Sequence, residues 1–340
     1  MKTYNNLFPE IIRFENLFNA ARNAARGKRE QPNVLLFFDR LEDNLWQLQH
    51  ELETQSYQPG GYSTFHIYDP KPRLISAAPF RDRVVHHALI NIIEPIFETR
   101  FIFDSYANRI GKGTHAAIRR FQLFLRKYEF ALKCDIRKYF PSIDHNILKT
   151  LIRRRIADAN ALWLIDTIID YSNLQESVVQ YFPGDDLLTP VERRQGLPIG
   201  NLTSQFFANV YLDPLDHFIK EQLGCQAYVR YVDDFVLLDN TKTILKDWWK
   251  RVADFLSLYK LKLNPNQCHI FPALTGRRFL GQVVYRTHRR LSAKNIRKLR
   301  SRMKQWNKYP PDNLIQRIAS WRGHAMQADS TELLKLLFRK

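Results

Sequence analysis

The pattern of apolar and polar positions predicts a chain that mixes helices with short antiparallel strands, an α+β fold. Apolar residues recur every three or four positions in several segments, which is the spacing of an amphipathic helix. Helices are expected over residues 4–27, 33–54, 114–128, 145–171 and 244–259. Alternating or continuous β-branched and aromatic residues predict strands instead. Strands are expected around 65–68, 73–76 and 130–136, on both sides of Asp233, and in pairs within 261–292.

Turn and capping residues add detail to this outline. A hairpin is expected over residues 177–196, with its turn at Pro183 to Asp185, because proline, glycine and aspartate favour tight turns. Asp82 and Thr114 each stand where the N-terminal cap of a helix is expected.

Two adjacent carboxylates, Asp233 and Asp234, lie between two strand-like apolar runs and predict the tip of a hairpin. Like charges at a tight turn repel unless they are solvated or neutralised by a cation, and the sequence alone leaves both possibilities open. A third carboxylate, Asp135, ends the strand expected at 130–136. If that strand pairs with the hairpin, Asp135 faces Asp233, and the cluster could hold two Mg²⁺ ions about 3.5–4 Å apart for an in-line phosphoryl displacement.

The segments LKCDIRKYFPSIDH and YVDDF resemble the two metal-binding motifs of reverse transcriptases, and Tyr231 to Asp234 form that family's most specific signature. The resemblance implies a right-hand polymerase with helical fingers, an antiparallel-sheet palm and a small helical thumb. It also implies that Asp135, Asp233 and Asp234 are catalytic, and that they and the main chain of Ile136 bind two Mg²⁺ ions, for which Mn²⁺ can substitute.

Composition and charge agree with a protein that binds nucleic acid. The 340 residues are 45% hydrophobic, enough for a real core, and 52 Lys and Arg against 34 Asp and Glu give a formal charge of +18. Three widely spaced cysteines, Cys134, Cys225 and Cys268, predict neither a disulfide framework nor a zinc site. The N-terminus lacks the apolar core of a signal peptide and no run of 18 apolar residues occurs, so a cytoplasmic protein without membrane contact is expected.

A long acid-free block lies near the C-terminus. Between Asp254 and Asp312 there are 14 Lys or Arg and no acidic residue, whereas a solvated helix face normally mixes signs. Trp306 and Tyr309 are interleaved with these cations, a composition typical of a surface that grips a phosphate backbone. Candidate template–primer contacts in this block are Arg297, Arg300 and Lys304.

Other candidate contacts come from the resemblance. The segment GGYSTFHIYDPKPRLISAAPF resembles the fingers hairpin of bacterial reverse transcriptases, which implies that Lys71 and Arg73 grip the incoming nucleotide, although a solvated basic loop is an alternative for Lys71. Arg109 and Lys112 match template-contact positions. Phe140 stands where a bulky side chain excludes a 2′-hydroxyl, and an ordinary core phenylalanine is the alternative.

The segment LPIGNLTSQFFANVYL narrows the resemblance to reverse transcriptases of diversity-generating retroelements. Ile199 stands where most reverse transcriptases carry glutamine, and Ser204–Gln205 where group II intron enzymes carry Ser-Pro, so Ile199 and Gln205 are candidate nucleotide contacts. The resemblance covers essentially the whole chain. The chain departs from the family pattern near Gln267, where the family usually has a lysine, and Lys262 is the nearest residue that could substitute for that lysine.

This resemblance implies error-prone, adenine-mutagenic cDNA synthesis and mutagenic retrohoming. The expected partners are a template RNA, a cDNA or primer, deoxynucleoside triphosphates and a small basic accessory variability protein. Three regions are expected: 1–130 with the N-terminal helices and fingers, 131–285 with the palm, and 286–340 with the basic thumb. The alternatives are a reverse transcriptase of another bacterial lineage, in antiviral defence or retron-like, and a non-catalytic RNA-binding protein on a polymerase scaffold.

Overall fold

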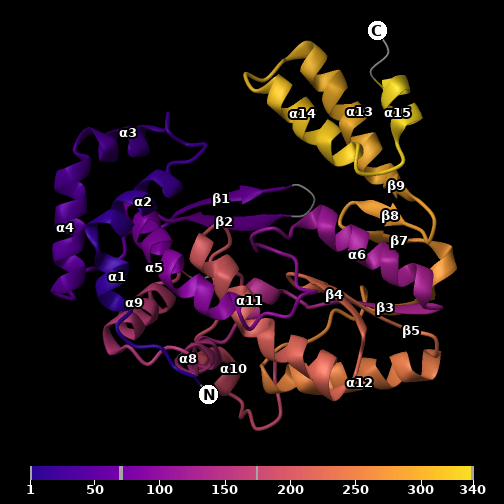
Figure 1. Ribbon diagram of the computed structural model, residues 1–340, viewed down its shortest axis with the longest axis horizontal. Helices are drawn as coiled ribbons and strands as arrows, with labels where there is room; N and C mark the ends of the chain where they lie inside the picture. The colour runs from indigo at the N-terminus through magenta and orange to yellow at the C-terminus, as the bar shows by residue number, and fades with distance from the viewer. Residues whose placement is uncertain (1, 69–71, 174, 338–340) are drawn as a thin grey trace. The chain divides into compact units, whose positions relative to one another are not determined.

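The computed structural model describes residues 2–68, 72–173 and 175–337 (Figure 1). The chain divides into two compact units. The first unit comprises Met1–Ile102, Ile136–Phe218 and Val252–Leu263, and the second comprises Phe103–Asp135, Ile219–Arg251 and Asn264–Lys340. The three functional regions expected from the sequence stay a prediction.

The first unit is mainly helical. Its helices are α1 (Phe8–Ile12), α2 (Phe14–Ala24), α3 (Pro32–Asp39), α4 (Leu41–Glu53), α5 (Phe80–Glu98), α7 (Tyr139–Ser142), α8 (His145–Arg153), α9 (Ala159–Asp170), α10 (Thr189–Glu192) and α11 (Leu202–His217). The strands β1 (Ser63–Ile67) and β2 (Arg73–Ala77) form an antiparallel pair, which confirms the two strands expected there. Helix α5 is buried along most of its length and packs against α2 and α11. Helix α12 (Lys242–Leu258) contributes residues to both units.

The second unit is organised on a four-stranded antiparallel sheet with the order β4–β5–β3–β6. Its elements are α6 (Thr114–Lys127), β3 (Phe130–Asp135), β4 (Ala227–Tyr231), β5 (Asp234–Asp239), β6 (His269–Pro272), β7 (Arg277–Phe279), β8 (Gln282–Val284), β9 (Arg289–Leu291), α13 (Ala293–Lys308), α14 (Leu314–Ala325) and α15 (Thr331–Leu337). Strands β7, β8 and β9 make a separate antiparallel sheet. The sequence-based expectation of an α+β fold is confirmed.

One face of the four-stranded sheet is apolar and covered. Ala131, Val229 and Val236 on this face belong to the same buried cluster as Phe121 of α6 and Phe279 of β7. Because side chains alternate between the two faces of a strand, Lys133 and Asp135 lie on the same face as Ala131. The buried apolar face therefore continues into charged residues at the end of β3, and this places the candidate site.

Several helix boundaries differ from those that the sequence predicts. The single helices expected over 4–27 and 33–54 are each two helices, because Arg13 has extended backbone (φ −54°, ψ 134°) and Arg40 also leaves helical geometry (φ −126°, ψ 51°). The helix expected over 145–171 is also two helices. Asp158 separates them, since its side chain accepts hydrogen bonds from the backbone N–H groups of Asn160 and Ala161 and so caps the start of α9.

The two strands of the hairpin expected over 177–196 are wrong, but its turn is confirmed, because the N–H of Asp185 donates to the carbonyl of Phe182 at 3.0 Å across Pro183 and Gly184. No strand occurs among residues 175–195, all of which the structure describes. Ion pairs hold this segment instead: Arg193 Nη2 lies 2.7 Å from Asp185 Oδ2, and Lys260 Nζ lies 3.1 Å from Asp185 Oδ1. Side-chain partners thus replace a strand ladder in fixing the segment.

The two expected helix caps are also wrong. Asp82 makes no cap; it lies inside α5, where its carboxylate accepts hydrogen bonds from Tyr57 Oη and Gly60 N, both at 2.8 Å. Gly113, at φ 99°, caps α6 in place of Thr114, because this left-handed backbone is much easier for glycine. In the described part of the chain, no helix combines the length and apolar character needed to cross a bilayer.

Candidate active site

The hairpin of β4 and β5 turns through two residues, Val232 and Asp233, and Tyr231 pairs with Asp234. Asp234 is therefore the first residue of β5, whereas the sequence suggested that both carboxylates form the tip. Val232 has φ 58°, a left-handed conformation that is strained for a β-branched side chain. Arg230 is fully buried, and its Nη1 donates a hydrogen bond of 3.1 Å to the carbonyl of Val232. This bond helps to hold the strained turn.

The pairing of β3 with β5 places Asp135 directly opposite Asp234. This corrects the expectation that Asp135 faces Asp233: the two-residue turn leaves Asp233 outside the ladder and brings Asp234 into it. Residues directly opposite in an antiparallel pair lie on the same face, with Cβ atoms about 4.5–5.5 Å apart. The structure thus brings two of the three predicted carboxylates side by side, with the third on the adjoining turn.

Lys133 lies two residues before Asp135 on the same strand face. Its Nζ is 2.8 Å from Asp234 Oδ2, and the two side chains are only 15% and 21% exposed. Burial raises the pKa of Asp234 above its usual value, although Lys133 acts in the opposite direction; the neighbouring Asp135 raises it further. Asp135 itself accepts a hydrogen bond of 3.1 Å from Asn264 Nδ2.

The carboxylate oxygens of Asp135 and Asp234 are ligands of the type that a hard divalent cation prefers. Oδ1 of Asp234 is buried and has no hydrogen-bond partner among the described residues, and an ionised carboxylate can only accept hydrogen bonds, so a cation would satisfy this atom. Among the described residues, no three or more His, Cys, Asp or Glu side chains form a group that could hold a metal ion. Metal binding by Asp135, Asp233, Asp234 and the main chain of Ile136 stays a prediction.

A separate set of candidate residues lies in the first unit, where main-chain bonds fix the Gly- and Pro-rich loop before α11. The N–H of Ser76 in β2 donates to the carbonyl of Ile199 at 2.9 Å, and the N–H of Leu197 donates to the carbonyl of Phe140 at 2.9 Å. Gly200 has φ 122°, and a Cβ there would lie 3.1 Å from Ile75 Cγ2, so glycine lets the loop lie against β2. The loop, the residue Phe140 and the strand that carries Arg73 are therefore linked.

The side chains of the nucleotide-binding candidates differ in exposure. Arg73 is exposed at the start of β2, while Phe140, Ile199 and Gln205 are half-buried. Lys71 lies outside the described residues. Nucleotide contact by these five residues stays a prediction.

The candidate template contacts fall into two groups. Arg109 Nη1 donates to the carbonyl of Ser105 at 2.9 Å, and Lys112 Nζ donates to the carbonyl of Phe103 at 2.9 Å, so both cations engage their own loop. The second group is Arg297, Arg300 and Lys304, all exposed on α13 at spacings of three and four residues, hence on one helix face. Lys262, the substitute for the missing lysine, has its Nζ 5.1 Å from the ring centroid of Phe182.

Sequence reasoning missed three residues of the carboxylate cluster. Lys133 could have been found, because strand periodicity puts it on the face of Asp135. Arg230 gave a weaker signal as a charge inside an apolar strand. Asn264 gave none, since it reaches Asp135 only through the tertiary fold. The structure also brings Cys134 and Cys268 into hydrogen-bond contact, which raises the pKa of the already buried Cys134 thiol further.

The chain is similar in sequence to known proteins. A family model described as reverse transcriptase (RNA-dependent DNA polymerase) matches residues 68–284. Protein YkfC of Escherichia coli (strain K12) is 27% identical over 300 residues, which cover 76% of this chain and 75% of YkfC. The group II intron-encoded protein LtrA of Lactococcus lactis subsp. cremoris is 25% identical over 181 residues, 52% of this chain but only 28% of LtrA.

Further similarities cover a shorter segment or are lower in identity. Nuclear intron maturase 1, mitochondrial, of Arabidopsis thaliana is 31% identical over 94 residues, which cover 28% of this chain and 13% of the maturase. Among solved structures, apo telomerase from Candida tropicalis aligns with a TM-score of 0.42 and 12% identity, over 67% of this chain and 47% of the telomerase chain. The chain thus spans three-quarters of YkfC but only a small part of LtrA and of the maturase.

Proposed function

This chain belongs to the reverse transcriptase family, the RNA-directed DNA polymerases, and we propose that it makes error-prone, adenine-mutagenic cDNA from a template RNA in a diversity-generating retroelement. The family assignment rests on a match that covers more than half of the chain. The retroelement assignment is finer and rests on the chain's own residues.

The observation that carries the proposal is the aliphatic side chain of Ile199 at a fixed place. Its carbonyl accepts the Ser76 N–H of β2 at 2.9 Å, so the main chain of the loop is held against the strand that carries Arg73. The resemblance described above implies glutamine at this position in most reverse transcriptases, and its amide can hydrogen-bond whereas the isoleucine side chain cannot. A polar restraint worth on the order of 1 kcal/mol is therefore missing, and each 1.4 kcal/mol of discrimination is about tenfold in selectivity.

The proposed chemistry assigns a role to each carboxylate. Asp135, Asp233 and Asp234, with the main chain of Ile136, would hold two Mg²⁺ ions, or Mn²⁺ in their place. When bound, such ions neutralise the charge that develops during phosphoryl transfer. Lys133 opposes the rise in the pKa of Asp234 that burial causes, and Asn264 orients Asp135 through the hydrogen bond to Oδ2.

The proposed partners follow from the same assignment. They are a template RNA, a primer or growing cDNA, deoxynucleoside triphosphates and a small basic accessory protein that helps to select the template. The high positive charge suits RNA, and the three buried free thiols suit a reducing cytoplasm.

A second candidate is a reverse transcriptase of the group II intron type. It is favoured by the similarity to LtrA and to the maturase, whose names refer to introns. Against it stands Ser204–Gln205 in place of Ser-Pro. A defence-type or retron-like enzyme, and a non-catalytic RNA-binding protein, are weaker alternatives; the carboxylate pair of Asp135 and Asp234 argues for catalysis.

Primer extension tests the proposal. Purified protein is given all four deoxynucleotides, Mg²⁺ and a primed RNA that contains all four template bases, and the cDNA is sequenced. We expect full-length cDNA with errors concentrated opposite template adenine. Accurate copying at every base would support the intron-type or defence-type enzyme, and no extension at all would support the non-catalytic alternative.

A further inference from the structure

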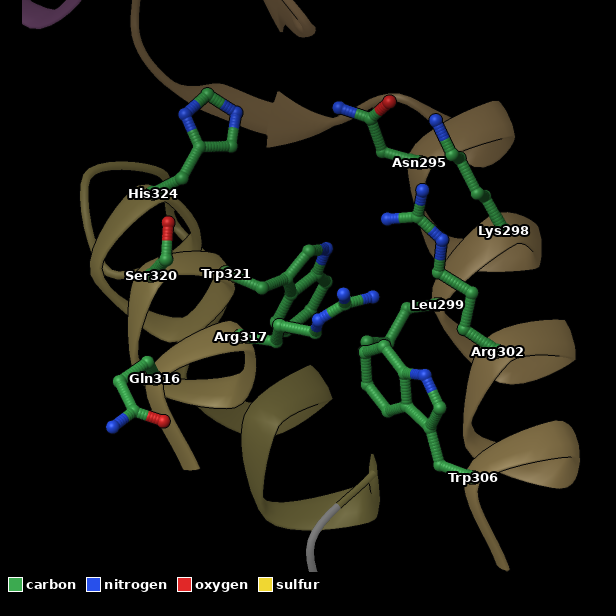
Figure 2. A pocket seen from close by; sticks show the side chains of 10 residues that line it. All are labelled: Asn295, Lys298, Leu299, Arg302, Trp306, Gln316, Arg317, Ser320, Trp321 and His324. Carbon is green, nitrogen blue, oxygen red and sulfur yellow. The ribbon is translucent and has the colours of Figure 1, made fainter. Parts of the chain in front are cut away.

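A pocket of ≈ 510 Å³ lies between helices α13 and α14 of the second unit (Figure 2). One stripe of α13, from Asn295 to Trp306, lines one wall, and one stripe of α14, from Gln316 to His324, lines the other. Pockets that hold small organic ligands have volumes of about 300–1,000 Å³, so this one can take a single nucleotide but no duplex.

The lining combines cations with large aromatic rings. Lys298, Arg302 and Arg317 contribute positive charge, and none of the described residues that line the pocket is an aspartate or a glutamate. Figure 2 shows Arg317 and the indole of Trp321 reaching from α14 toward Trp306 on α13. Trp306 is only 9% exposed and Trp321 is half-buried, so both indoles are held in place by packing.

One end of the pocket is fixed by contacts with the rest of the second unit. Asn295 Nδ2 donates a hydrogen bond of 2.9 Å to the carbonyl of Gly281, and the ring of His324 stacks on His115 of α6 with centroids 5.8 Å apart. A ligand would therefore meet a wall that is already ordered, which lowers the entropic cost of binding.

This pocket is distinct from the exposed basic face of α13. Arg297, Arg300 and Lys304 on that face do not line the pocket. A surface with cations alone suits a phosphate backbone, whereas cations beside indoles suit a nucleotide whose base is unpaired, since a free base can stack on an aromatic ring. The Asp and Glu side chains of an acidic peptide would use the cations but offer no aromatic ring to stack on the two indoles.

We propose that this pocket binds one unpaired nucleotide of a single-stranded RNA, with the base against the indoles of Trp306 and Trp321. The guanidinium groups of Arg302 and Arg317 bind the adjoining phosphate, because their planar forks match phosphate oxygens in pairs. The site would hold an unpaired segment of an RNA and takes no part in bond formation. Binding at this site does not depend on DNA synthesis.

Equilibrium binding of the full chain to a short fluorescent oligouridylate, without divalent metal or nucleotides, tests the proposal. The pocket variant is Arg302→Gln with Arg317→Gln, and its matched control is Lys294→Gln with Arg322→Gln, which removes the same charge from the same two helices outside the pocket. We expect the pocket variant to bind about tenfold more weakly than the control. Both variants lose the same non-specific attraction, and only the pocket variant also loses the two guanidinium contacts to the bound phosphate. Equal affinities would overturn the proposal.

Photocrosslinking and competition locate the ligand and identify its class. An oligonucleotide that carries 5-iodouridine should crosslink to peptides containing Trp306 or Trp321, and exclusive crosslinking elsewhere would refute the site. An abasic RNA of equal length should bind about tenfold more weakly than oligouridylate to the wild-type chain. Two outcomes would contradict the proposal. Equal binding of the abasic RNA would indicate a site for phosphate alone. Displacement of oligouridylate by polyglutamate, with the same dependence on Arg302 and Arg317, would indicate a site for an acidic protein.

Discussion

Lys133 Nζ lies 2.8 Å from Asp234 Oδ2, on the sheet face that also carries Asp135. Strand β3 thus supplies both the carboxylate of Asp135 and the cation, Lys133, that pairs with Asp234 on β5. The pair is largely buried, so removing one member leaves a charge that the protein cannot easily solvate.

We therefore expect Lys133→Met to lower the free energy of unfolding by roughly 1–3 kcal/mol in the absence of divalent ions, because Asp234 then loses its partner. Added Mg²⁺ should restore more stability to the variant than to the wild type, since a ligand that binds only the folded state stabilises it. Urea denaturation with and without Mg²⁺ measures both effects, and Lys133→Arg serves as the charge-retaining control. Equal responses to Mg²⁺ in variant and wild type would contradict this role of Lys133.

Asp135→Asn and Asp233→Asn should each reduce DNA synthesis by at least about a hundredfold, because a lost metal ligand removes charge stabilisation that the transfer needs. Template RNA binding should stay within about twofold, since neither residue belongs to the basic surfaces. Single-nucleotide extension and filter binding give the two readouts. Either variant extending a primer at close to the wild-type rate would remove that aspartate from the catalytic set.

Asp185 makes the stability of the first unit depend on pH. The hydrogen bond from Arg193 lowers the pKa of Asp185 to about 2, and the bond from Lys260 adds to this effect. An unfolded aspartate titrates near 3.9, so the stabilisation is complete above about pH 5 and is lost as the pH falls toward 2. Asp185→Asn should lower the urea midpoint at pH 7, with a difference from wild type that shrinks on acidification. The exposed Asp312→Asn is the control, and a difference independent of pH would show that the ion pair is not its source.

Charge reversal of Arg297, Arg300 and Lys304 should weaken template–primer binding and reduce the slope of log affinity against log salt by about 2 to 3, because fewer counterions are released. Reversal of Lys246, Lys250 and Arg251 on α12 gives a variant with the same net charge. Salt titrations of both triple variants separate a local contact from a general charge effect. If the two slopes coincide, the α13 face is an ordinary solvated surface.

Ile199→Gln should lower misincorporation opposite template adenine by roughly tenfold or less, because the amide restores a polar contact worth on the order of 1 kcal/mol. Ile199→Leu, which keeps the aliphatic character, should leave the error spectrum close to that of the wild type. Sequencing of cDNA from the three enzymes on one RNA measures the change. An unchanged adenine error rate in Ile199→Gln would mean that fidelity is set elsewhere, for example at Arg73.

The sequence by itself determined the local elements whose formation depends on neighbouring residues. Alternation of apolar residues located β3, and the run on either side of Asp233 located the β4–β5 hairpin. The signature Tyr231 to Asp234 was enough to indicate the family that the family model then confirmed. Helix boundaries at Arg13, Arg40 and Asp158 were missed, because backbone geometry and capping at single residues decide them.

Only the tertiary structure decided which charged groups meet. The opposition of Asp135 and Asp234 depends on a two-residue turn and on strand register, and a shift of one residue would move every side chain to the other face. The bond from Asn264 to Asp135 joins residues 129 apart in sequence. The pocket of α13 and α14 likewise exists only where two helices pack, since helical spacing fixes which residues share a face but not which face another helix covers.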